Sequence, residues 1–177
     1  MKQLIIMKKT LLLLTAILTT TFICGQDLRV EVSGNASFDN SQYVVTEAGE
    51  DFPSSIESET SLFVSVRYSA GFLGYLFYPD KRWRIFIHKS DLNWNSDLTL
   101  SAERTGNGSI VANWTAQPQY IRDGSNFQNI TNNPVYFFRG RHGIVNIPLS
   151  FKLTGASLTM GAKDFETNVI LTVYDEW

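Results

Sequence analysis

A period-two alternation of apolar and polar residues recurs from residue 27 to the end of this chain of 177 residues. Such alternation is typical of β-strands with one buried face, because successive side chains of a strand point to opposite sides. After residue 26, no stretch keeps a helical period over about ten residues. The sequence therefore predicts an all-β fold, a single antiparallel β-sandwich of the Ig-like or jelly-roll-like kind. The clearest alternating stretches are 27–33, 62–68, 82–88, 149–153 and 169–173.

The first 25 residues have the pattern of a secretory signal peptide. Three lysines precede an apolar run around residues 11–18, and Gly25 is a small residue at the expected cleavage site. The run is shorter than the roughly 20 residues that span a bilayer as a helix, and no later stretch is long and apolar enough. We therefore predict a signal peptide at 1–25, one domain at 26–177 without a transmembrane segment, and export to the periplasm, the cell surface or the extracellular space.

Cleavage after Gly25 would remove Cys24, the only cysteine. Lipidation of Cys24 is the alternative, and Phe22 and Ile23 disfavour it because small residues normally precede an acylated cysteine. In either case the mature domain has no internal disulfide. Its stability then depends on the hydrophobic core, which about 150 residues can supply.

The net charge of the mature chain is expected to be negative. Loss of three lysines with the signal peptide lowers 15 basic residues to 12, against 17 acidic residues, so the formal charge changes from −2 to −5. Nucleic acids and anionic membranes require a basic face on their partner. The charge therefore argues against a nucleic-acid partner.

Residues 71–78 break the alternation, because apolar and aromatic side chains occupy both faces there. The favoured interpretation is a central strand buried on both sides, and the alternative is an exposed surface for a protein partner or for self-assembly. In the second case the contact residues would be Phe72, Tyr75, Phe77 and Tyr78.

Several connections are also predicted. We expect a hairpin with a three-residue loop around residues 106–108, in which Leu100 pairs with Trp114 and Ala102 with Ala112, so that the apolar faces coincide. Further predictions are a short strand at 42–46, a surface loop at 47–60, a long connection at 116–134 and a short strand at 135–138.

The stretch 139–143, RGRHG, is predicted to be a turn. Arg139 and Arg141 beside glycines could bind an anion through guanidinium and backbone N–H groups, although a solvated turn is the favoured interpretation.

Four oxygen-bearing side chains at alternate positions, Asp91, Asn93, Asn95 and Asp97, resemble the first ligands of a calcium loop. The glycine and the glutamate that an EF-hand loop needs further on are missing. A polar turn is the favoured interpretation, with calcium as the alternative and no other cofactor expected.

No nucleophile elbow, HExxH motif, P-loop or dinucleotide motif occurs, so we predict no catalytic residues and no enzymatic activity. The aromatic content instead favours a carbohydrate-binding module as one alternative, since flat rings stack on sugars. Trp94 and Tyr120 are the expected stacking residues. A small glycan-active hydrolase that uses Asp91 or Asp97 is a third and weaker hypothesis.

The stretch 147–173 resembles the closing strands of small secreted bacterial β-sandwich proteins, including fimbrial subunits of the spore-coat-U type. Gly161, Asp164 and Thr167, followed by the alternation at 169–173, carry the resemblance. The cysteine pair of those subunits is missing here. The resemblance implies a structural or adhesive role at the cell surface or outside the cell. Our first hypothesis is accordingly an exported, non-enzymatic binding or structural protein, an adhesin or a fimbrial-type subunit.

Overall fold

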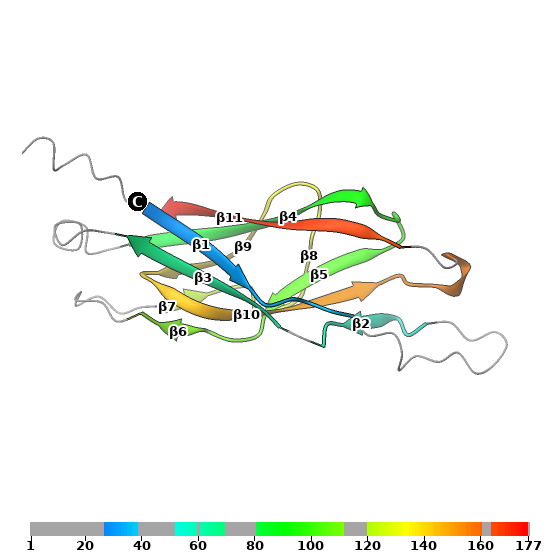
Figure 1. The fold of residues 1–177 in the computed structure, drawn as a ribbon, viewed down its shortest axis with the longest axis horizontal. Helices are drawn as coiled ribbons and strands as arrows, with labels where there is room; N and C mark the ends of the chain where they lie inside the picture. Colours follow the sequence, from blue (N-terminus) through cyan, green and yellow to red (C-terminus); the bar gives the residue numbers. More distant parts are fainter. Residues whose placement is uncertain are drawn as a thin grey trace, which may run out of the picture.

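The computed structural model describes residues 27–38, 52–59, 61–69, 81–111, 120–160 and 164–176. Two antiparallel sheets pack face to face, which confirms the predicted all-β sandwich (Figure 1). The first sheet has the order β1 (Asp27–Ser33), β3 (Leu62–Ser69), β10 (Ile144–Thr154), β5 (Thr99–Arg104) and β8 (Gln128–Asn129), with β2 (Ser55–Glu57) and β6 (Ser109–Ile110) also paired to β10. The second has the order β11 (Glu166–Glu176), β4 (Arg82–Asn93), β9 (Val135–Arg141) and β7 (Tyr120–Arg122).

Helical structure in the described part of the chain is confined to a short 3-10 turn at Leu158–Met160. Among these residues, no helix has the length and apolarity needed to cross a membrane.

The core lies between the two sheets and is built from the apolar positions of the alternating stretches. Trp83 is its largest member, and its ring packs edge-on against Phe138 at a centroid distance of 6.0 Å. The indole Nε1 donates a hydrogen bond of 2.7 Å to the backbone oxygen of His142, so this buried polar atom is satisfied. The largest fully buried side chains among the described residues are Val64, Val66, Trp83, Ile85, Ile87, Phe137, Phe138, Ile144, Ile147 and Leu149.

A β-bulge in β9 determines which of its side chains face outward. Ile85 of β4 pairs with Phe138, whereas the next residue, Phe86, pairs with Tyr136. Phe137 is therefore the extra residue, and both consecutive phenylalanines are buried. The bulge thereby places Tyr136 beside Phe86 on the outer face of the second sheet.

The predicted hairpin after β5 is wrong. Ala102 of β5 pairs with Phe151 of β10 on one side and with Gln128 of β8 on the other, so both edges of β5 are occupied. The short strand β6 pairs with β10 instead, Ile110 opposite Ile144. The prediction failed because it matched the apolar faces of two neighbouring stretches, whereas strands more distant in the sequence pair with both edges of β5.

Three predicted loops are partly strands. The predicted surface loop 47–60 contains β2, whose Ile56 is buried, and the connection 116–134 contains β7 and β8. The predicted turn 139–143 is wrong for residues 139–141, because β9 continues through them to Arg141. The predicted strand at 42–46, the signal peptide and the 71–78 run lie outside the described residues.

Candidate functional site: an arginine- and tyrosine-rich sheet face

The outer face of the second sheet concentrates arginine and aromatic side chains. Residues directly opposite each other on neighbouring strands share one face, so the register decides which side chains are neighbours. In one row across the sheet, Arg82 of β4 is opposite Arg141 of β9, which is opposite Tyr120 of β7. We call this surface the arginine–tyrosine face. It comprises Arg82, Arg84, Phe86, Tyr120, Arg122, Tyr136, Arg139, Arg141, Tyr174 and Glu176.

Three pairs of arginines stand directly opposite each other on this face. They are Arg82 with Arg141, Arg84 with Arg139, and Arg139 with Arg122. Like charges in directly opposed positions destabilise a sheet. The side chains of Arg84 and Arg139 are 45% and 40% exposed, so both can be reached by a ligand, whereas the Nε atom of Arg139 is buried. The positive charges on this face therefore repel one another, and a bound anion would reduce this repulsion.

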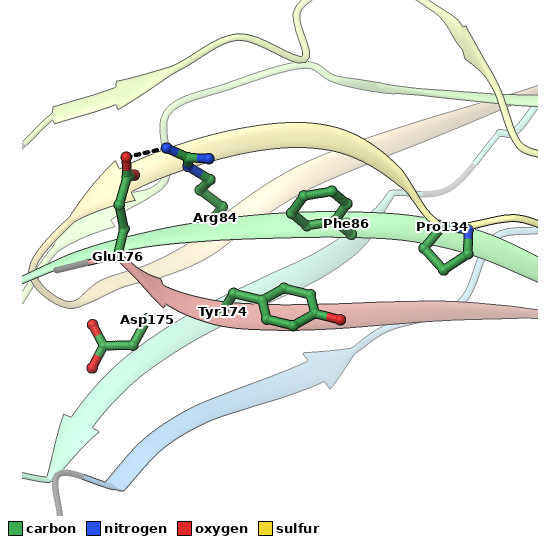
Figure 2. Close-up of a pocket in the computed structure, with 6 residues that line it drawn as sticks. All are labelled: Arg84, Phe86, Pro134, Tyr174, Asp175 and Glu176. Carbon is green, nitrogen blue, oxygen red and sulfur yellow. Dashed lines mark hydrogen bonds and ion pairs between the residues drawn. The ribbon is translucent and has the colours of Figure 1, made fainter.

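Two carboxylates partly offset this charge. Glu176 accepts a hydrogen bond from Arg84, and this bond lowers the pKa of Glu176, with further lowering from Arg139 and Arg82 (Figure 2). Asp123 Oδ2 lies 3.4 Å from Arg139 Nε. One carboxylate is thus stabilised in its charged form by three neighbouring arginines.

The hydroxyl of Tyr136 and the guanidinium of Arg104 hold Asp123 in place. Tyr136 donates a hydrogen bond to the Asp123 carboxylate, and burial together with this bond raises the pKa of Tyr136, so that its hydroxyl stays protonated. Arg104 Nε donates to the backbone oxygen of Asp123 at 3.0 Å, and its Nη1 donates to the Gly106 oxygen at 2.7 Å. Asp123 has a φ of 68°, which lets the chain turn sharply after β7.

Aromatic rings border the arginines. Phe86 meets Tyr136 edge-to-face at 5.9 Å on one side and Tyr174 at 5.2 Å on the other, and Tyr174 is 53% exposed. Figure 2 shows Phe86 and Tyr174 side by side, with Arg84 and Glu176 further along the same strands. These four residues line an open hollow of about 520 Å³, a size within the range of ligand sites. Pro134 and Asp175 complete the lining.

Of the two predicted stacking residues, only Tyr120 belongs to this face. Its ring lies 4.9 Å from the Arg122 guanidinium carbon and 5.3 Å from that of Arg141. Trp94 follows the opposite end of β4, packs against the core, and donates from Nε1 to the Leu98 oxygen at 2.9 Å. The structure therefore does not bring the two aromatic residues together.

The predicted calcium ligands are divided between a strand and a turn. Asp91 and Asn93 belong to β4, whereas Asn95 and Asp97 form an Asx turn through a 3.0 Å hydrogen bond from the Asp97 N–H to Asn95 Oδ1. Both carboxylate oxygens of Asp91 accept from Lys89 Nζ, at 2.5 and 2.7 Å. No group of three or more His, Cys, Asp or Glu side chains fit to hold a metal occurs within the described ranges. Calcium binding here stays a prediction.

The candidate partner residues Phe72, Tyr75, Phe77 and Tyr78 lie outside the described residues. Donor-strand assembly would require the N-terminal strand to be free to leave the molecule. In the structure, β1 is paired along its whole length with β3.

Comparisons with family models, with curated proteins and with solved structures give no match. The function is therefore inferred from the site itself.

The sequence pointed to part of this site. Arg82, Arg84 and Phe86 alternate with core residues, and Arg139 and Arg141 were anion-binding candidates. Net charge gave no sign of a basic face, because it sums over all surfaces and conceals how the charges are distributed. Arg122 and Tyr174 had no local signal, since only strand pairing brings them to the same face.

Proposed function

We propose that this chain is an exported, non-enzymatic binding protein whose anionic ligand binds the arginine–tyrosine face. The observation that carries the proposal is the continuous block of three directly opposed arginine pairs. Folding brings these like charges together, and an anion that binds between the guanidinium groups would remove the repulsion. Such a face would also serve an adhesin, because anionic polymers are common on cell surfaces.

A comparable pair lies at the edge of the other sheet, where Arg29 is opposite Arg67. There Arg67 Nε lies 3.1 Å from Glu31 Oε2, and the neighbouring positions of β1 and β3 carry no second arginine pair. It therefore offers a matched control for the experiment below.

The lowered pKa of Glu176 argues against a role for this residue as a general acid. A carboxyl group that acts as general acid needs a raised pKa, which keeps its proton available near neutral pH. The Arg84 hydrogen bond has the opposite effect on Glu176. This carboxylate is accordingly a fixed hydrogen-bond acceptor.

Dextran sulfate and uncharged dextran, which share one sugar backbone, test the proposal by calorimetric titration of the purified protein. We expect dextran sulfate to bind and dextran not to bind. The double variant Arg84→Gln/Arg139→Gln should lower the affinity by about 100-fold, roughly tenfold for each guanidinium group that is removed. The control Arg29→Gln/Arg67→Gln removes the same charge from the other sheet and should change the affinity less than threefold. Equal losses of affinity in both variants, or no binding of dextran sulfate, would overturn the proposal.

A further inference from the structure

We infer that the ligand of the arginine–tyrosine face is a linear acidic polysaccharide whose sugar rings carry carboxylate groups. This inference rests on the proposed function and specifies the chemistry of its ligand. Three features of the face carry it: the extent of the arginine block, the rings beside it, and the carboxylates within it.

The arginine block is too extended for a single small anion. It crosses β4, β9 and β7, whose spacing is about 4.8 Å per strand, and it has two rows separated by about 7 Å along the strands. Charges spread over roughly 10 Å by 7 Å match several anionic groups on one chain. A polymer with regularly spaced charges is therefore the fitting ligand.

The aromatic rings indicate that this polymer also has flat apolar surfaces. Tyr174 and Phe86 lie immediately beside Arg84, and more than half of the Tyr174 surface is exposed. Tyrosine offers an apolar ring for stacking and a hydroxyl for hydrogen bonding. A sugar ring presents its C–H face to such a ring while its carboxylate reaches the adjacent guanidinium.

The carboxylates of Glu176 and Asp123 favour a sugar polymer over a nucleic acid. Both are held on the face by ion pairs with Arg84 and Arg139. They can accept hydrogen bonds from sugar hydroxyls, which inorganic polyphosphate and the backbone of DNA lack. The formal charge of −2 also differs from that of nucleic-acid-binding domains, which are usually strongly basic.

The test compares polygalacturonate with its fully methyl-esterified form, which has the same sugar chain without the charge. We expect polygalacturonate to bind at least tenfold more tightly than the ester, than inorganic polyphosphate and than single-stranded oligodeoxythymidylate. Tyr174→Ala should weaken polygalacturonate about tenfold and polyphosphate less than twofold, because only the sugar polymer stacks, while the control Tyr174→Phe should keep the affinity. Acidification below about pH 3.5 should abolish polygalacturonate binding, since its carboxylates become protonated, and leave dextran sulfate bound.

Tighter binding of the oligonucleotide or of polyphosphate would overturn the inference in favour of a phosphate polymer. Equal effects of Tyr174→Ala on polygalacturonate and polyphosphate would also overturn it. If dextran sulfate binds through Arg84 and Arg139 and polygalacturonate does not bind, the inference fails and the proposed function stands. If neither polymer binds, both fail.

Discussion

Gly140 lies where a side chain would collide with the largest residue of the core. A Cβ atom placed there would be 2.6 Å from Cη2 and 2.9 Å from Cε2 of Trp83, and closer still to Cζ2. Carbon atoms in contact are normally 3.5–4.0 Å apart. The ring cannot retreat easily, because it is fully buried, packs against Phe138, and is held by its bond to His142. Strands β4 and β9 would therefore have to separate.

We predict that Gly140→Ala lowers the free energy of unfolding by about 3 kcal/mol, the upper end of the usual range for overpacking. For a domain of this size, that corresponds to a fall in Tm of roughly 10 °C. Urea unfolding followed by circular dichroism measures the destabilisation, and an unchanged m-value would show that the unfolded state is not affected.

The same substitution in a Trp83→Phe background tests whether the collision with the indole ring causes the destabilisation. Trp83→Phe removes the three indole atoms that the new methyl group would meet, so Gly140→Ala should cost less than about 1 kcal/mol in that background. Trp83→Phe is itself destabilising, because it opens space and leaves the His142 oxygen without its donor. If Gly140→Ala costs the same in both backgrounds, or costs little in the wild type, the steric explanation is wrong.

Three further substitutions test the arginine–tyrosine face and Arg104, which holds the loop beside it. Arg122→Gln should raise the free energy of unfolding by about 0.2–1 kcal/mol at low salt, since it removes the repulsion with Arg139, and the gain should shrink in 1 M NaCl, as urea titrations would measure. Arg104→Met should cost about 2–4 kcal/mol in the same assay, because it removes the hydrogen bonds by which a buried guanidinium joins two loops. The bond from Arg84 lowers the pKa of Glu176 from 4.5, so its stabilisation is present above that pH and is lost as the pH falls through the lower folded pKa. Glu176→Gln should therefore reduce the fall in stability between about pH 5 and pH 2, and an unchanged profile would contradict this.

Alternation predicted most strands with one buried face correctly, because burial of one side imposes a period of two on the sequence. In β1 it failed at Val32, which was expected on the buried face and is 52% exposed. Val64, Val66, Ile85 and Ile87 are fully buried as expected from their stretches. Pairing was less predictable, because it is decided by residues far apart in the chain. Leu100, which we expected to pair with Trp114, is opposite Leu153.

The arginine–tyrosine face was hard to predict from the sequence for the same reason. Arg84, Arg122 and Arg139 come from three strands that are adjacent in space but not in the sequence. A glycine beside two arginines favoured a turn at residues 139–143, whereas Gly140 belongs to a strand. Its missing side chain is explained by the Trp83 ring on the neighbouring strand, a proximity with no signature in the local sequence.

One segment of β9 contributes both to the core, through Gly140 packed on Trp83, and to the candidate binding face. Gly140 faces the core against Trp83, while Arg139 and Arg141 on either side of it face outward. The close approach of β4 and β9 at this glycine holds the arginines of the two strands directly opposite each other. A larger residue at Gly140 would relieve the repulsion by separating the strands, and it would also disturb the spacing of the guanidinium groups. Stability and ligand binding therefore both depend on the absence of a side chain at this position.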